Sequence, residues 1–96
     1  MVVPFVQPNS QTFTRANIEV ITPGQMGVYG IFKTNRWIYV GSGDIRNRLL
    51  AHFNGDNTCI TGELPTHYVD EVTTSYIQRE KDLIRELTPA CNQRVG

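Results

Sequence analysis

The sequence predicts a small α+β domain with a three-stranded antiparallel β-sheet flanked by helices. Segments 28–33 and 37–41 are rich in aromatic and β-branched residues, and the short polar turn between them predicts a β-hairpin. Two segments with helical spacing of apolar residues follow, and another strand-like segment lies between them. The order strand, strand, helix, strand, helix is typical of an α+β domain.

An N-terminal extension precedes the hairpin. We expect residues 1–23 to form an arm and a lead-in segment, and residues 24–96 to form the domain. Residues 1–11 contain several Pro, Gln and Asn residues, which predicts an irregular arm with Phe5 as its packing anchor. A Pro-Gly turn ends the lead-in segment.

The two hairpin strands each have two faces, because successive side chains in a strand point in opposite directions. In the first strand this places Val28 and Tyr29 on opposite faces. In the second strand it places Trp37 and Tyr39 on the same face. Residues 34–36 form the expected turn.

The second half of the chain predicts two helices and one strand. Asp44 is the expected N-cap of a helix over residues 44–53. Residues 58–66 are expected to form a loop, and residues 67–73 a third strand. A longer helix over 75–87 is stopped by a Thr-Pro pair.

Composition bounds the class of protein. The 96 residues suffice for one domain, and the 40% hydrophobic and 19% charged content is that of an ordinary globule. No apolar run has the length of a membrane span. The N-terminus lacks the basic start and apolar core of a signal peptide, so we expect a cytoplasmic protein without a membrane partner. Nine basic and nine acidic residues cancel, which argues against nucleic-acid binding by overall charge.

The two cysteines do not have the spacing of a zinc site. In a cytoplasmic chain, Cys59 and Cys91 are expected to be free buried thiols.

Charged residues interrupt the apolar stripes of both helices. Ile45, Arg48, Leu49 and His52 share one side of the first helix. The corresponding stripe of the second helix consists of Ile77, Glu80, Ile84 and Leu87. A charge on an inward stripe is costly unless it is paired or used.

Two interpretations of these residues stay open. In the structural one, Arg48 and Glu80 form a partly buried ion pair, His52 is a satisfied core or surface histidine, and Tyr29 and Tyr39 pack with satisfied hydroxyls. In the functional one, all five side chains meet in one cleft. Glu80 would then supply an oxygen ligand for Mg²⁺ or Mn²⁺. Arg48 would stabilise developing charge, and Tyr29, Tyr39 or His52 would relay a proton.

The motifs resemble those of the GIY-YIG nuclease superfamily. Its first motif corresponds to Gly27–Tyr29 and its second to Tyr39–Gly41. The family's helical arginine and its following tyrosine or histidine correspond to Arg48 and His52. Its helical glutamate corresponds to Glu80, and its closing Pro-x-x-Asn to Pro89–Asn92. The resemblance covers roughly residues 24–92.

The resemblance implies a fold and a set of roles. The fold is a three-stranded antiparallel sheet with helices, and its active site lies on one sheet face. A single divalent ion is held at the position of Glu80. Tyr29 is the candidate proton acceptor from the attacking water, supported by Tyr39. Asn92 has either a structural or a phosphate-side role.

The sequence departs from the family pattern just after the second motif. Ser42 stands where many members have lysine, and the stretch from Gly41 to Arg48 is one residue shorter. Lys33 or Arg46 could supply the missing positive charge. The residues expected to contact the nucleic acid are Gly41, Ser42, Lys33, Arg46 and Asn92. We also expect the glycines of the motifs, Gly41 among them, to let the backbone approach a phosphate.

These features predict a metal-dependent endonuclease with DNA as the expected substrate. A homodimer or a partner protein would supply affinity that the neutral domain lacks. The alternative is a non-catalytic nucleic-acid- or protein-binding module that keeps the fold. A structural subunit of a larger complex, with an apolar patch around Trp37 or Phe5, is a third interpretation.

Overall fold

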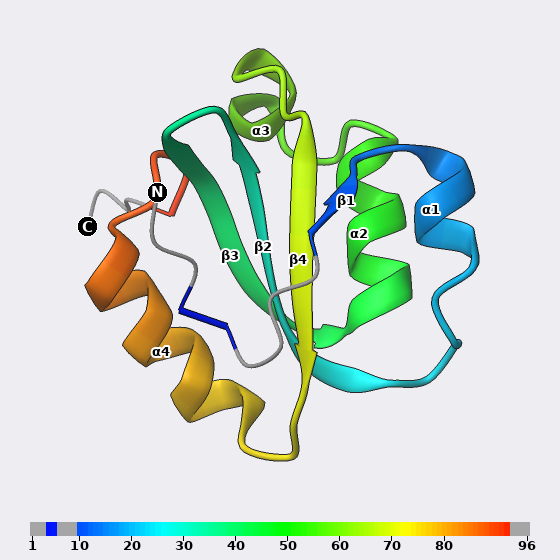
Figure 1. Ribbon diagram of the computed structural model, residues 1–96, viewed down its shortest axis with the longest axis vertical. Coiled ribbons are helices and arrows are strands. Elements are labelled where there is room, and N and C mark those ends of the chain that lie inside the picture. Colours follow the sequence, from blue (N-terminus) through cyan, green and yellow to red (C-terminus); the bar gives the residue numbers. More distant parts are fainter. Residues whose placement is uncertain (1–3, 6–9, 93–96) are drawn as a thin grey trace.

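A computed structural model describes residues 4–5 and 10–92 of the protein (Figure 1). All described strands lie in one antiparallel sheet with the order β1-β4-β2-β3. The strands are β1 (Gln11–Thr12), β2 (Met26–Lys33), β3 (Arg36–Asp44) and β4 (His67–Val72). The helices are α1 (Arg15–Glu19), α2 (Ile45–Phe53), α3 (Thr58–Gly62) and α4 (Tyr76–Leu87). The predicted α+β class is confirmed. The sheet has four strands instead of three, because the short β1 pairs with β4.

The β2–β3 hairpin contains a β-bulge that changes which side chains share a face. The two-residue turn at Thr34–Asn35 places Asn35 at φ 59°, a conformation that Asn tolerates better than most residues. Beyond it, Phe32 pairs with Trp37 but Ile31 pairs with Tyr39, so Ile38 is the extra residue. The bulge puts Trp37 and Tyr39 in different packing layers. The prediction that they share a face was therefore wrong.

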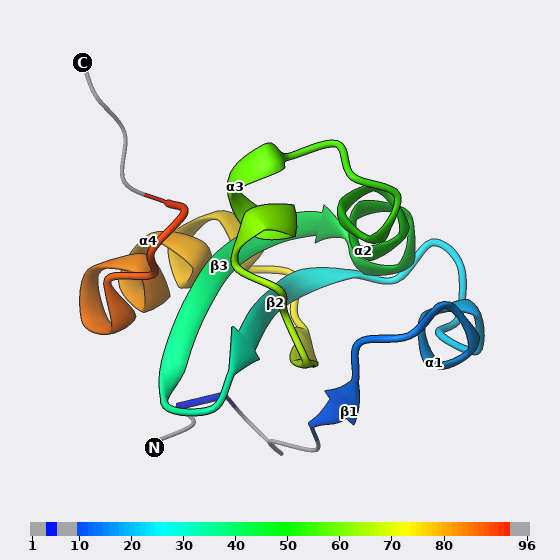
Figure 2. The ribbon, with the colours of Figure 1, turned by 90° about the horizontal axis from the view of Figure 1, so that it is seen from above.

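Two hydrophobic layers form, one on each side of the sheet. Figures 1 and 2 show α4 on one side and α1 and α2 on the other. The layer beneath α1, α2 and α3 contains Ile18, Tyr29, Ile31, Ile38, Ile45, Leu49, Ile60 and Tyr68. The layer beneath α4 contains Phe5, Val28, Phe32, Trp37, Val40, Val69 and Leu83. The sheet is thus covered on both faces, and Tyr29 belongs to the α2 side.

The lead-in segment contributes to this core. Ile18 of α1 is fully buried against the sheet. Phe5 of the predicted arm is also buried and stacks on Trp37 at a centroid distance of 5.8 Å. Phe5 and Trp37 are therefore buried and do not form the exposed apolar patch of the third interpretation. Predictions for residues 1–3, 6–9 and 93–96 lie outside the described residues.

Local signals placed α2 correctly and α4 almost correctly. The Asp44 carboxylate accepts a hydrogen bond from the Asn47 N–H at 3.1 Å, which confirms the predicted N-cap. In α4 the sheet-facing stripe runs through Tyr76, Glu80 and Leu83, while Ile77 is 61% exposed. The predicted stripe was wrong at Ile77, since the helix is rotated so that the neighbouring position faces inward.

The predicted loop 58–66 contains the helix α3, whose first turn is capped by Asn57. This helix brings Cys59 to Cys91, and the two form a disulfide with a Cα–Cα distance of 5.7 Å. The prediction of free buried thiols was wrong, because α3 fixes Cys59 beside a segment that runs along β3. The Cys91 N–H donates to the Ile38 carbonyl at 2.8 Å in that segment.

None of the helices in the described part of the chain is long and apolar enough to cross a membrane. The cytoplasmic location stays a prediction.

Candidate active site

Three aromatic side chains from three elements meet on the α2 side of the sheet. Tyr29 comes from β2, Tyr39 from β3 and His52 from the last turn of α2. The Tyr29 and His52 side chains lie with the phenol oxygen 2.8 Å from Nε2. The Tyr39 ring lies 5.0 Å from the His52 ring and 6.3 Å from the Tyr29 ring, centroid to centroid. Tyr29 and His52 are 1% and 3% exposed, so their polar atoms depend on each other.

Gly41 makes room for this cluster. Gly41 pairs with Tyr29 across the hairpin. A Cβ atom at position 41 would collide with the phenol oxygen of Tyr29 and approach the Tyr39 ring to 2.9 Å. The space that the second motif's glycine leaves is therefore filled by the protein's own tyrosine. A phosphate contact at Gly41 stays a prediction, but packing alone already requires a glycine there.

Arg48 lies at the open margin of the cluster. Its guanidinium interacts with the Tyr29 phenol, and its Nη2 is 3.8 Å from Oδ2 of Asp56. The side chain is 44% exposed, so it is less inward-facing than the stripe predicted. The predicted Arg48–Glu80 ion pair is not formed, since Arg48 pairs with Asp56. An exposed ion pair of this kind adds little stability, so another anion can replace Asp56 as the partner of Arg48.

Burial sets the protonation states in the cluster. Burial raises the pKa of the Tyr29 phenol well above its usual range, with a further increase from Tyr39, while Arg48 opposes the shift. Burial lowers the pKa of His52, and the Asp56 carboxylate opposes that shift. At neutral pH the phenol is protonated and the imidazole is neutral, so the Tyr29 hydroxyl donates to Nε2. The other ring nitrogen, Nδ1, then carries the hydrogen that faces Asp56 at 2.8 Å.

Glu80 approaches the same region from the opposite sheet face. The Ser42 hydroxyl on β3 donates a hydrogen bond to Oε1 of Glu80. Ser42 directly follows Gly41, so α4 holds the carboxylate beside the edge strand that Tyr29 covers from the other side. The Glu80 charge is close enough to contribute to the raised pKa of Tyr29.

Three other predicted site residues are engaged elsewhere. Lys33 donates to the Glu63 backbone carbonyl at 2.8 Å, about 13 Å along β2 from Tyr29 by strand rise. Arg46 points to α1, where its Nε lies 3.5 Å from the Glu19 carbonyl. Asn92 accepts from the Val40 N–H at 2.7 Å and donates to the Val40 carbonyl at 2.9 Å. These two hydrogen bonds to the backbone of β3 favour the structural alternative for Asn92.

The donor set around Glu80 is sparse for a metal ion. Among the described residues, no group of three or more His, Cys, Asp or Glu side chains could hold one. Glu80 and the Ser42 hydroxyl nevertheless offer two hard oxygen atoms at one place. Mg²⁺ keeps several waters and uses phosphate oxygens as ligands, so one carboxylate with a neighbouring hydroxyl fits such an ion.

No family model, curated protein or solved structure matches this chain. The resemblance to the GIY-YIG nucleases therefore rests on the motif residues of the sequence alone.

Asp56 is a site residue that the motifs did not indicate. It contacts both His52 and Arg48. Its four-residue spacing from His52 was a weak signal, because Asp56 lies beyond the end of α2 and the loop at Gly55 brings it to the imidazole.

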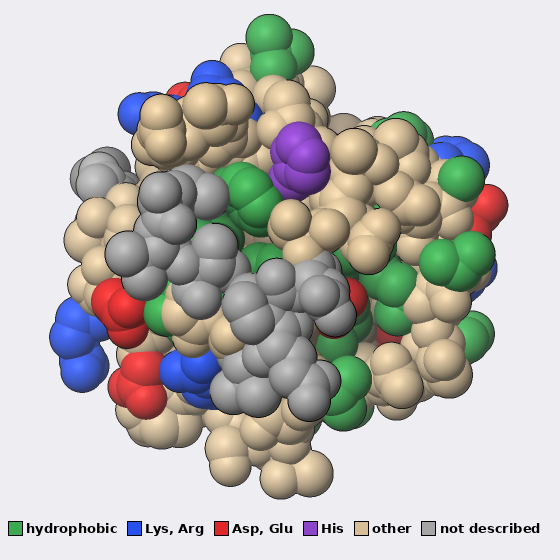
Figure 3. Space-filling view, viewed as in Figure 1, with side chains coloured by type: hydrophobic (Ala, Val, Ile, Leu, Met, Phe, Trp, Pro, Cys, Tyr) green, Lys and Arg blue, Asp and Glu red, His purple; other side chains and the backbone are tan. Residues whose placement is uncertain are grey.

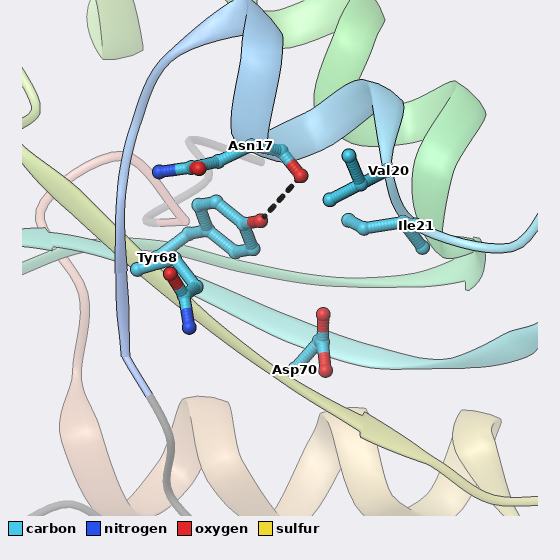
Figure 4. A pocket seen from close by; sticks show the side chains of 6 residues that line it. Asn17, Val20, Ile21, Tyr68 and Asp70 are labelled. Carbon is cyan, nitrogen blue, oxygen red and sulfur yellow. Dashed lines mark hydrogen bonds between the residues drawn. The ribbon is translucent and has the colours of Figure 1, made fainter.

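A separate hollow of about 310 Å³ lies between α1 and β4 (Figure 4). Asp70 lines it, and the Tyr68 hydroxyl there donates to the Asn17 carbonyl at 3.2 Å. Tyr29 does not line this hollow, so it is distinct from the tyrosine cluster.

Charge on the visible surface is mixed. In Figure 3, Lys and Arg side chains lie in separate groups, most of them at the margin and one inside the outline at the lower left, with Asp or Glu side chains near them. Examples among the ion pairs are Arg36–Glu63 and Arg15–Glu19. The described part of this face therefore presents no continuous basic surface for a duplex.

Proposed function

We propose that the protein is a GIY-YIG type endonuclease that hydrolyses phosphodiester bonds with the help of a divalent ion, with DNA as the expected substrate. The resemblance covers residues 24–92, which form β2, β3, β4, α2, α3 and α4, and β1 and α1 precede this region. The observation that carries the proposal is the meeting of Tyr29, His52 and Arg48 in one cluster, with Glu80 beside the same stretch of β3.

The proton path follows from the hydrogen bonds. An attacking water gives its proton to the Tyr29 oxygen while the Tyr29 hydroxyl proton passes to Nε2 of His52. The water oxygen forms the new P–O bond as the P–O bond to the leaving oxygen breaks, and the leaving oxygen takes a proton from solvent. This order avoids a free tyrosinate, which burial makes unfavourable.

Arg48 is suited to stabilise the charge that develops on the phosphate. Its exposed guanidinium already lies against the Tyr29 phenol. A phosphate that takes Arg48 from Asp56 would be held beside the phenol oxygen, in reach of the attacking water. Glu80 with Ser42 would hold Mg²⁺ or Mn²⁺, which neutralises phosphate charge when bound.

The near-complete burial of Tyr29 favours one alternative, a non-catalytic binding module. In that case the Tyr29–His52 hydrogen bond only satisfies two polar groups in the core. Cleavage and binding assays on duplex, single-stranded, nicked and branched DNA and RNA, with Mg²⁺, Mn²⁺ or EDTA, separate the two functions. The proposal requires metal-dependent cleavage of at least one substrate. Binding without cleavage, equal with and without metal, would establish the alternative.

A further inference from the structure

We infer that Asp56 is a positioning residue for His52, which fixes the imidazole as a proton acceptor for Tyr29. Its consequence for catalysis rests on the proposed function, whereas its effect on the imidazole does not. The inference comes from the linear order Asp56, His52, Tyr29, in which each contact measures 2.8 Å.

The backbone places Asp56 firmly. After α2 ends, Gly55 adopts φ 90°, which only glycine adopts without strain. The Gly55 N–H donates to the His52 carbonyl and the Asp56 N–H donates to the Ala51 carbonyl, both at 3.1 Å. This pattern closes the helix end and turns the chain back toward the imidazole. The Asp56 carboxylate therefore reaches Nδ1 from a fixed loop.

The carboxylate selects one tautomer. A carboxylate at neutral pH only accepts hydrogen bonds, so Nδ1 of His52 must carry the hydrogen. Nε2 is then left with its lone pair directed at the Tyr29 hydroxyl. In the other tautomer, Nδ1 and the carboxylate would present two acceptors to each other.

Within residues 4–5 and 10–92, Asp56 is the one carboxylate that acts on His52. Titratable or charged groups that face the imidazole are Tyr29 from β2, Tyr39 from β3, Arg48 from α2 and Asp56. The side toward β1 and α3 is lined by uncharged residues such as Phe13 and Ile60. When Tyr29 passes its proton to Nε2, the imidazolium that forms is neutralised by Asp56.

Asp56 is also shared with Arg48. Oδ1 faces His52 while Oδ2 lies 3.8 Å from Arg48. If a phosphate draws Arg48 away, the carboxylate charge acts on His52 alone, which strengthens the base when substrate is bound.

The test uses the imidazole ¹⁵N and ¹H resonances of the full chain. The chain has two histidines, so His67, whose Nδ1 contacts Thr66 instead of a carboxylate, is an internal control. We expect wild-type His52 to be a single Nδ1–H tautomer. In Asp56→Ala, the Nε2–H form should appear and the pKa of His52 should fall further. The matched control Asp82→Asn removes an exposed carboxylate on α4 that accepts from Gln78, and should leave His52 unchanged.

Each outcome separates the claims. Unchanged tautomer and pKa in a folded Asp56→Ala protein would overturn the positioning role. If the proposed function holds, kcat should fall about 100-fold without a rise in KM, because Arg48 is then free for the phosphate, and the rising limb of the pH profile should move to lower pH. Altered resonances with wild-type kcat would overturn the catalytic consequence. If wild type cuts nothing while the resonances change as expected, the proposed function fails and the positioning role stands.

Discussion

The phenol oxygen of Tyr29 lies 2.8 Å from Nε2 of His52, and both side chains are buried. Each side chain satisfies part of the other's hydrogen-bonding requirement, and Arg48 on Tyr29 and Asp56 on His52 supply the further contacts. The same contact is the first step of the proposed proton path. Measurements of stability and of cleavage on the same variants therefore separate the structural role of this contact from its catalytic role.

Replacing Tyr29 with Phe tests this contact. The variant leaves Nε2 of His52 buried without a donor, which should lower the unfolding free energy by about 1–3 kcal/mol. Cleavage should be lost, because the proton acceptor is gone. Tyr68→Phe is the matched control, since its buried hydroxyl donates to the Asn17 carbonyl away from the site. Denaturant unfolding and cleavage by both variants would be compared. Full cleavage by Tyr29→Phe would contradict the proton path.

Gly41→Ala tests the packing of the tyrosine over the second motif. The added methyl collides with the Tyr29 phenol, which should destabilise the fold by about 1–3 kcal/mol. Gly62→Ala should be harmless, because no heavy atom lies within 4 Å of a Cβ there. The cost of Gly41→Ala should shrink in a Tyr29→Ala background, where both the phenol oxygen and the ring carbon that collide with the methyl are absent. An equal cost in both backgrounds would show that the clash lies elsewhere.

The buried imidazole should make stability depend on pH. The pKa of His52 is lowered in the folded protein, so the unfolded chain binds the proton more readily. This contribution is fully present above the ordinary histidine pKa of about 6.5 and is lost as pH falls below it. We expect unfolding free energy to decrease from pH 7.5 to 5 in wild type and to decrease less in His52→Gln. An identical pH dependence of the unfolding free energy in the two proteins would refute the lowered pKa of His52.

The Cys59–Cys91 disulfide should stabilise the fold. Its residues are 32 positions apart, so loop closure in the unfolded chain predicts a contribution of roughly 3–4 kcal/mol. Thiol titration of the unreduced, denatured protein should find no free thiol. The double variant Cys59→Ser and Cys91→Ser should unfold at lower denaturant concentration, as should wild type after reduction. If the unreduced protein instead has two free thiols and unfolds at the same denaturant concentration as the reduced protein, the disulfide is ruled out.

Local sequence signals were sufficient for much of the fold. The Asp44 cap, the spacing of Ile45 and Leu49, and the alternation at Val28 and Tyr29 act within a few residues, so they could be recognised from sequence. The bulge at Ile38 could not, because it depends on pairing between strands.

The candidate site was predicted in the same uneven way. The motif residues Tyr29, Tyr39, Arg48 and His52 lie together in the structure, and Glu80 lies near them. They did not reveal that Asp56 takes the role of partner to Arg48, since a loop conformation at Gly55 decides this. The disulfide was missed for a related reason, as it depends on where α3 packs.

The most direct test of the central claim is cleavage by Glu80→Ala in Mg²⁺, measured beside Glu86→Ala. Both variants remove a carboxylate from α4, but Glu86 is exposed whereas Glu80 accepts from Ser42 beside β3. We predict that Glu86→Ala cuts like wild type and that Glu80→Ala, folded and equally stable, cuts at no measurable rate. Metal-dependent cleavage at the wild-type rate by Glu80→Ala would contradict the proposed active site.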